Sequence, residues 1–284
     1  MGMFLCPKQP NPKKEVSVRI SEALDRQLAL MCDLTYTETP YWYGSTRRPL
    51  HLDVIRPRDT QVMQPVLVWF CGGAFQQMDH HLWLPDLVWY AQRGFTVASV
   101  EYRVGVNGRW PAPVDDAWAA IRYLRDNALA FGMDPARMAV MGESAGGYIA
   151  SALGIGMRRP DDMSPVQAAV NLYGVSDLEN MLAFEQTHGH TSIRDFLSDL
   201  PEGQRMSADI LSGIHGKTAD FLILHGTDDQ RVPPENSVRL RDRLLACGSK
   251  TELILIEGAG HGSPQVYTEP WRQRILTFLK KSMQ

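Results

Sequence analysis

The chain has 284 residues, of which 44% are hydrophobic, and carries a formal net charge of -3 at pH 7. This length and composition can bury the core of one large α/β domain, so we expect a single domain over residues 1–284. The sequence has no basic excess and no lysine and arginine cluster with interleaved aromatic residues, which excludes nucleic acid as an expected partner. A small neutral or weakly charged ligand fits this charge better.

The first 15 residues, MGMFLCPKQPNPKKE, have neither the positive start nor the long apolar core of a secretory signal. No run of 18 apolar residues follows, so we expect no membrane partner and a cytoplasmic protein, while a leader already removed would leave no trace in this sequence. Cys6, Cys32, Cys71 and Cys247 are scattered without a CxxC spacing, which favours reduced thiols over disulfides. A homodimer is an assembly that the sequence leaves open.

Residues 1–48 precede the regular pattern and are interpreted as an N-terminal extension, in which residues 21–31 predict a helix and residues 36–43 are aromatic and irregular. From about residue 49 onwards, short apolar runs alternate with longer helical patterns. The predicted strands are residues 50–55, 66–70, 96–100, 138–141, 168–172, 221–224 and 253–256. The predicted helices are residues 82–92, 114–131, 146–155, 234–246 and 267–281.

This alternation predicts an α/β fold with a mostly parallel central sheet and helices on both faces. One segment interrupts it: residues 176–217 are a stretch of mixed polar and apolar residues between two predicted strands. A segment of this length inside a compact domain is usually functional or carries its own helices. Two interpretations stay open, a small cap over the active site and a decoration without a role.

The residues Gly142 to Gly147, which read GESAGG, lie between a predicted strand and a predicted helix. In the pattern GxSxG, glycines on both sides of the serine allow a strained turn that holds the hydroxyl out at the start of the helix. Ser144 is therefore a candidate nucleophile. Because a serine hydroxyl is a poor nucleophile at neutral pH, it needs a neighbouring imidazole as base and a carboxylate that orients this imidazole.

Two of the eight histidines, His225 and His261, follow the predicted strand 168–172 and lie close to the end of a later strand. His225 closes the strand 221–224, whereas His261 lies in the glycine-rich loop EGAGHG and after an acidic pair. We choose His261 as the base, against the alternative of an ordinary histidine in a surface loop.

The acidic pair is Asp228 and Asp229, directly after the penultimate predicted strand. We choose Asp229, and Asp228 stays open because adjacent residues on a turn point in different directions. Either aspartate could instead stabilise a turn or cap a helix ahead of Pro233 and Pro234.

Acyl transfer also needs N–H donors for the oxyanion of the tetrahedral intermediate. Gly72, Gly73 and Ala74 follow the predicted strand 66–70, where glycines allow the backbone to turn its amides inward, and Ala145 follows the nucleophile. A plain turn at the exit of a strand is the alternative.

These residues resemble the α/β-hydrolase superfamily, and more narrowly its esterase branch, which includes hormone-sensitive-lipase-type carboxylesterases and bacterial carbohydrate esterases active on acetylated or feruloylated xylan. The similarity spans about residues 50–279. Its most specific parts are the turn 71–75, Tyr102 and Arg103, the stretch 110–113, Asp115 and Asp116, residues 131–137, the GESAGG turn, and the Asp229 and His261 loops.

The resemblance implies an α/β-hydrolase fold with Ser144 as nucleophile, His261 as general acid and base, and Asp229 as its partner. It also implies Gly73, Ala74 and Ala145 as the oxyanion donors. The family turn usually reads HGGG or HGGx, whereas here Cys71 replaces the histidine and Ala74 the last glycine. Backbone amides survive both changes. A Cys71 nucleophile is a competing hypothesis, but no histidine lies near it in an arrangement that the fold would use.

The leading hypothesis is a serine esterase that hydrolyses small acyl esters, with acetyl or feruloyl groups on plant carbohydrate as the expected substrates. It requires no metal and no organic cofactor. Trp42, Trp110 and Tyr148 are candidates for stacking on a sugar or an aromatic ring, or else belong to the core. An amide or formamide hydrolase of the kynurenine formamidase type is an alternative, and a ligand-binding relative without catalysis is another. The filled triad positions argue against the last.

Overall fold

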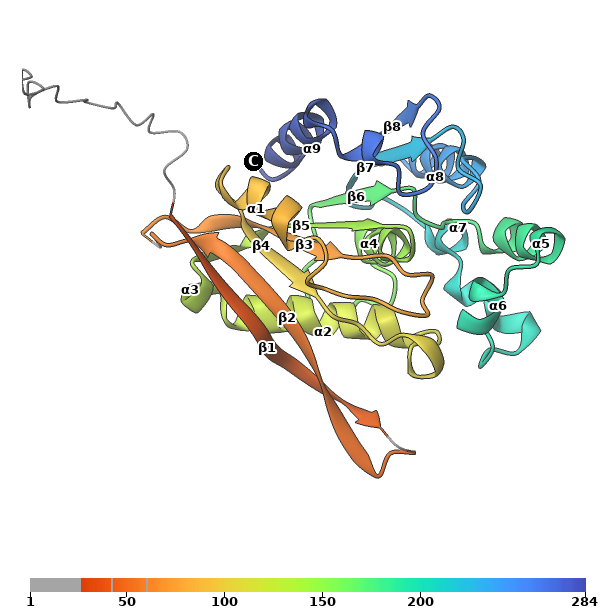
Figure 1. Cartoon of the computed structure of the whole chain (residues 1–284), viewed down its shortest axis with the longest axis horizontal. Helices are drawn as coiled ribbons and strands as arrows, with labels where there is room; N and C mark the ends of the chain where they lie inside the picture. The colour runs from red at the N-terminus through yellow and green to blue at the C-terminus, as the bar shows by residue number, and fades with distance from the viewer. Residues whose placement is uncertain (1–26, 42, 60) are drawn as a thin grey trace, which may run out of the picture.

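The computed structural model describes residues 27–41, 43–59 and 61–284 (Figure 1). The elements of the first half are β1 (Leu28–Tyr41), β2 (Thr46–Pro57), β3 (Gln64–Phe70), α1 (Leu84–Ala91), β4 (Thr96–Val100), η1 (Gly105–Asn107), α2 (Ala112–Asp126), α3 (Ala128–Phe131) and β5 (Met133–Glu143). Those of the second half are α4 (Ala145–Gly154), β6 (Ala168–Leu172), α5 (Leu178–His188), α6 (Ser192–Phe196), η2 (Glu202–Ala208), α7 (Ile210–Gly213), β7 (Asp220–Gly226), α8 (Glu235–Ala246), β8 (Thr251–Ile256), η3 (Pro264–Tyr267) and α9 (Glu269–Ser282).

The strands form one eight-stranded sheet in the order β1-β2-β4-β3-β5-β6-β7-β8. From β4 to β8 all neighbours are parallel, while β1 and β2 pair antiparallel with each other and β2 pairs antiparallel with β4. Every strand predicted from the sequence lies within one of these strands. The predicted α/β fold with a mostly parallel sheet is confirmed.

Alternate side chains of β3 point into two different cores. Val66, Val68 and Phe70 pack in a core that also contains buried residues of α2, α4 and α8, whereas Leu67 and Trp69 pack in a second core with residues of α1 and α9. Successive residues of a strand face opposite sides of the sheet, so a strand covered on both sides must be apolar throughout. The helices thus cover both faces, as predicted. No helix in the described part of the chain is long and apolar enough to cross a membrane.

The N-terminal region differs from the prediction. The helix predicted for residues 21–31 is wrong over Leu28 to Met31, which begin β1, and its first six residues lie outside the described part of the chain. The irregular stretch predicted for residues 36–43 is strand up to Tyr41, and Trp42 is outside the described residues. The reason is pairing with a distant segment: β1 pairs with β2 along its length, and the Tyr36 hydroxyl donates to the Glu101 carbonyl at 2.7 Å.

The remaining elements follow the prediction with local changes. The single helix predicted over residues 114–131 is two helices, because the chain leaves helical geometry at Asn127, whose side chain donates back to the Tyr123 carbonyl at 2.8 Å. The segment 176–217 carries helices of its own, α5, α6, η2 and α7. In Figure 1, α5 and α6 lie beyond the ends of β6 and β7, at the carboxyl edge of the sheet. The three cysteines in the described residues are free.

Candidate active site

Ser144 lies on the turn between β5 and α4, with a φ of 54° and a ψ of -118°. A positive φ is unfavourable for any residue with a side chain, so the surrounding contacts must impose it. The two glycines of the motif allow these contacts, because they have no Cβ atom that would collide with the neighbouring backbone. A Cβ atom on Gly142 would lie 2.2 Å from the Gly146 carbonyl oxygen, and one on Gly146 would lie 2.0 Å from the Phe70 carbonyl oxygen. The GxSxG pattern is therefore required by the close packing of this turn against β3.

The structure brings the three predicted triad residues together. The Ser144 Oγ atom lies 2.9 Å from Nε2 of His261, and Nδ1 of the same imidazole lies 2.7 Å from Oδ2 of Asp229. These three residues follow the carboxyl ends of β5, β8 and β7, and β6 is the one strand between β5 and β7 in the sheet. A hydroxyl, an imidazole and a carboxylate linked in this order can move a proton from the serine while the carboxylate holds the imidazole in place.

Asp229 is buried and fully hydrogen-bonded. Its Oδ1 accepts the N–H groups of Arg231 and Val232 at 2.8 and 2.9 Å. Burial alone would raise the pKa of Asp229, but hydrogen bonds from His225 and His261, together with the charge of His261, outweigh it and hold the pKa well below its ordinary value. Asp228 is exposed, and its side chain accepts the hydroxyl of Thr227. The geometry therefore assigns the contact with His261 to Asp229.

His225, the histidine that the sequence analysis did not choose as the base, also belongs to the site. It is fully buried, and its Nε2 lies 2.9 Å from the Val232 carbonyl oxygen and 3.3 Å from Oδ2 of Asp229. Its Nδ1 lies 2.6 Å from the Ser237 hydroxyl. An imidazole that carries its proton on Nε2 satisfies all three contacts, with Ser237 donating to Nδ1. The four-residue spacing from His225 to Asp229 is the sequence signal that could have indicated this.

His225→Leu should lower kcat by about 10- to 100-fold and leave KM nearly unchanged, because Asp229 loses a hydrogen bond to its charged form. A carboxylate with fewer donors attracts the imidazolium more strongly, so the low-pH limb of kcat/KM should move toward neutral pH. His225→Gln retains an amide donor in place of Nε2 and should recover part of the rate. Loss of folded protein alone would reduce the active fraction without shifting the pH profile, and that result would contradict a positioning role.

The amide-rich turn after β3 lies opposite Ser144. Gly73 and Ala74 have φ values of 134° and 56°, and with Ala145 they line the same cavity as Ser144 and His261. Among the described residues, no backbone hydrogen bond uses the N–H of Gly73, Ala74 or Ala145. Unpaired backbone amides in the same cavity as a serine hydroxyl are the donors that an oxyanion needs.

Gly72 does not contribute a free amide, unlike Gly73 and Ala74. Its N–H donates to Oε1 of Glu143 at 2.6 Å, and the Tyr102 hydroxyl donates to the Cys71 carbonyl at 2.6 Å. These two bonds hold the turn in which Cys71 stands in place of the family's histidine. Burial raises the pKa of Glu143, although the Gly72 N–H opposes the shift.

Cys71 has none of the properties of a nucleophile. Its side chain is buried, and burial raises the pKa of the thiol to about 12. A thiol with such a pKa carries almost no thiolate at neutral pH, and thiolate is the reactive form. Cys71 is also absent from the residues that line the cavity.

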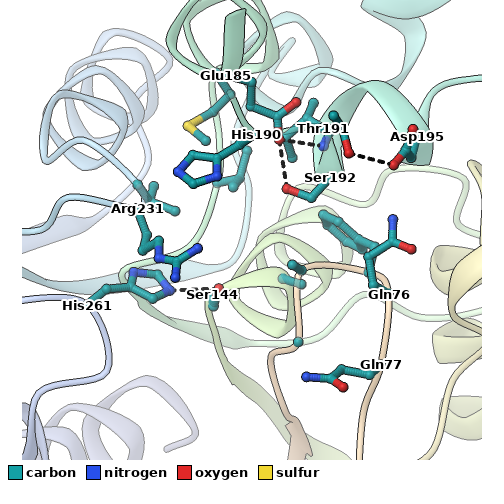
Figure 2. Close-up of a pocket in the computed structure, with 18 of the residues that line it drawn as sticks. Gln76, Gln77, Ser144, Glu185, His190, Thr191, Ser192, Asp195, Arg231 and His261 are labelled. Carbon is teal, nitrogen blue, oxygen red and sulfur yellow. Dashed lines mark hydrogen bonds between the residues drawn. The ribbon is translucent and has the colours of Figure 1, made fainter. Parts of the chain in front are cut away.

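The cavity in front of Ser144 has a volume of about 870 Å³ and is lined by polar and apolar side chains. In Figure 2, Arg231 lies beside His261 and Ser144, His190 lies on the same side of the view as Arg231, and Gln76 lies on the opposite side. One wall comes from residues 181–195 of the inserted segment, held by Glu185, which accepts the Ser192 hydroxyl at 2.7 Å. The inserted segment therefore borders the site.

Trp110 and Tyr148, two of the aromatic residues proposed to stack on a substrate, do not line this cavity. Trp110 is 6% exposed and Tyr148 is fully buried, with its hydroxyl donating to the Ala208 carbonyl at 2.6 Å. Both rings pack edge-on against Phe196. The stacking hypothesis is thus wrong for Trp110 and Tyr148, because the core needs these rings, and Trp42 lies outside the described residues.

The chain is similar to known esterases. The model of the family described as BD-FAE matches residues 52–244. The chain is 29% identical over 238 residues to isoprenylcysteine alpha-carbonyl methylesterase ICME of Arabidopsis thaliana, which covers 77% of this chain and 55% of that protein. It is 30% identical over 243 residues to esterase LipC of Mycobacterium tuberculosis, which covers 78% of this chain and 58% of that protein. The chain thus spans little more than half the length of these relatives.

Solved structures share the fold. A truncated carbohydrate esterase from gut microbiota superimposes with a TM-score of 0.77 at 20% identity, over 93% of this chain and 98% of that one. An acetyl ester-xyloside bifunctional hydrolase from Caldicellulosiruptor lactoaceticus gives a TM-score of 0.73 at 24% identity, over 87% of this chain and 96% of that one. At these identities, the likeness establishes the fold.

Proposed function

The chain belongs to the BD-FAE family of α/β-hydrolase esterases, and from this premise we propose that it is a serine esterase that cleaves small acyl esters. The observation that carries the proposal is the continuous contact from Ser144 through His261 to Asp229, beside a cavity that Gly73, Ala74 and Ala145 also line. A ligand-binding protein would not need a proton relay behind a hydroxyl.

In the first half of the reaction, the Ser144 oxygen attacks the ester carbonyl carbon while His261 takes the hydroxyl proton. Asp229 stays ionised and stabilises the imidazolium that forms. The negative charge moves to the carbonyl oxygen, where the N–H groups of Gly73, Ala74 and Ala145 would receive it. When the intermediate collapses, His261 gives its proton to the leaving alcohol, and the acyl group remains on Ser144.

In the second half, water attacks the acyl-enzyme and His261 takes one of its protons. Collapse of the second tetrahedral intermediate returns this proton to Ser144 and releases the carboxylic acid. The sum is one ester and one water converted into an acid and an alcohol.

The cavity suits a polar alcohol, and its volume of about 870 Å³ can hold either an acetyl or a feruloyl acyl group. Gln76 and Arg231 offer hydrogen-bond donors that suit the hydroxyl groups of a carbohydrate. The Thr191 and Ser192 hydroxyls donate to Asp195 and Glu185, so they offer acceptors. An alkyl chain longer than the apolar part of the cavity would have to lie against these polar groups and remove them from water. That apolar part is lined by Phe75, Val175, Met181, Ile193 and Val232. We therefore propose acetylated or feruloylated carbohydrate as the substrate class.

A fluorophosphonate probe followed by peptide mass spectrometry tests the reaction type. The probe should form one adduct, on the peptide that contains Ser144, and none after Ser144→Ala. Hydrolysis of acetyl, butyryl, octanoyl and feruloyl esters, acetylated xylan and an N-formyl amide then tests the substrate class. Acetyl should exceed octanoyl by about 10-fold or more in kcat/KM. Absence of labelling would reject the enzyme, and faster turnover of the formyl amide would favour the amide hydrolase.

A further inference from the structure

Four side chains from three distant segments converge outside the cavity. Asp33 lies on β1, Asp53 on β2, and His80 and His81 on the loop between β3 and α1. One side-chain nitrogen or oxygen atom from each lies within 4.8 Å of those of the other three. These residues contribute nothing to the proposed ester hydrolysis, so their convergence needs a separate explanation.

The distances within this cluster are too long for hydrogen bonds. Nε2 of His80 lies 3.7 Å from Oδ1 of Asp33 and 3.6 Å from Oδ1 of Asp53. Nε2 of His81 lies 3.4 Å from Oδ1 of Asp33 and 3.5 Å from Oδ2 of Asp53. A direct N–H···O bond would bring these atoms to about 2.7–3.2 Å.

Two buried polar atoms in the cluster have no partner among the described residues. Asp53 is 0% exposed, and its Oδ2 makes no hydrogen bond, while its Oδ1 accepts the Asp33 N–H at 2.8 Å. His80 is 7% exposed, and its Nε2 makes none either. A buried carboxylate without a compensating charge is costly, so these atoms are expected to share a cation.

The orientation of His81 is set by a neighbouring carboxylate. Oδ1 of Asp79 lies 3.2 Å from Nδ1 of His81 and also accepts the His81 backbone N–H at 2.9 Å. A carboxylate that accepts from Nδ1–H leaves a lone pair on Nε2, which is the atom turned toward Asp33 and Asp53. Carboxylates behind metal-bound histidines act in this way.

We propose that Asp33, Asp53, His80 and His81 form a four-coordinate site for a divalent transition-metal ion of the zinc class. At metal–ligand bonds of about 2.0–2.1 Å, the ligand atoms of a tetrahedral site lie about 3.3–3.4 Å apart. With Oδ1 of Asp33 and Oδ2 of Asp53 as the ligand oxygens, three of the separations to the imidazole nitrogens are close to this value, at 3.4, 3.5 and 3.7 Å. Calcium and magnesium prefer oxygen ligands, and the two imidazoles therefore favour zinc. Four protein ligands fill the coordination sphere, as in structural sites.

Such an ion would link β1 and β2 to the loop that carries the proposed oxyanion amides of Gly73 and Ala74. This loop runs from the end of β3 through Gly73 and Ala74 to His80 and His81. A second contact links the loop after β3 to the sheet at the same place. Asp53 on β2 pairs with Ser99 on β4, and the Ser99 hydroxyl donates to the His80 carbonyl. The proposed role is structural, and the ion takes no part in the ester chemistry.

The test uses the full chain, stripped with a chelator and titrated separately with Zn²⁺ by calorimetry and with Co²⁺ by visible absorption. We expect one ion per chain, the intense absorption of tetrahedral cobalt, its loss when zinc is added, and a higher Tm with zinc. Asp79→Ala should weaken zinc binding by about 10- to 100-fold, and the ligand variants Asp53→Asn and His81→Gln should weaken it further.

His215→Gln provides the matched control, because His215 is exposed and far in sequence from the cluster. It should bind zinc as the unmodified chain does. Asp53→Asn also removes the buried charge, so its metal-free form should keep the Tm of the metal-free parent, which separates lost binding from lost folding. Binding below one ion per chain, a six-coordinate cobalt spectrum, or equal affinity in Asp53→Asn and His215→Gln would overturn the site. None of these measurements depends on esterase activity.

Discussion

Ser144→Ala should reduce kcat for ester hydrolysis by about 10⁵- to 10⁶-fold, the scale seen when a triad nucleophile is removed. The Ser144 Oγ atom lies 2.9 Å from the imidazole that would take its proton, and no other hydroxyl is in contact with His261 among the described residues. Steady-state rates with p-nitrophenyl acetate measure the effect. Rates should be recorded at high enzyme concentration, so that a residual activity can be separated from the uncatalysed reaction.

Ser207→Ala is the matched control, since this serine is exposed and its hydroxyl donates only to the Gln204 carbonyl. It should keep the parental rate. Ser144→Ala should also keep the parental Tm closely, because alanine and serine are similarly strained at a φ of 54°. Full activity in folded Ser144→Ala would show that another group is the nucleophile.

Asp229→Asn should lower kcat by about 10⁴-fold, while Asp228→Asn should change it little. The asparagine amide cannot hold the imidazole in the tautomer that accepts the serine proton, and it cannot stabilise the imidazolium. The two variants remove the same charge from adjacent positions, so each controls for the other. Only Asp229 is buried and 2.7 Å from Nδ1 of His261.

The same pair of variants can be distinguished by acid unfolding. The pKa of Asp229 is held below its ordinary value, so its ionised form stabilises the folded state at neutral pH, and this stability is lost as the pH falls through the folded pKa. Asp229→Asn should therefore flatten the acid limb of the stability curve, whereas Asp228→Asn should leave it in place. Equal loss of activity in both variants would contradict the assignment.

The elements that the sequence predicted well are those whose pattern is complete within a few residues. The strand Val66 to Phe70 is apolar at every position because both faces are covered, and its neighbours in the sheet do not alter that requirement. The glycines of the GxSxG turn are likewise needed by close contacts around the turn, above all between Gly142 and Gly146. Such features can be read from the sequence without knowledge of the rest of the fold.

The errors occur where a distant segment decides the outcome. Residues 28–31 suit a helix locally, yet β2 offers them a row of hydrogen-bonding partners and they become strand. Trp110 and Tyr148 were candidates for stacking on a sugar, with the core as the alternative, and the core is what the structure shows, because Phe196 from the inserted segment packs against both. In each case tertiary contacts outweighed a weak local preference.

The sequence by itself determined the reaction centre: the strained turn at Ser144, and an acid and a histidine that follow it in the order of the family. Only the tertiary structure decided between Asp228 and Asp229, placed His225 behind the acid, and brought Asp33 and Asp53 to His80 and His81. The physical reason is that backbone strain and strand apolarity are local properties. The direction of a side chain on a turn, and the meeting of residues from separate strands, depend on how the whole sheet is assembled.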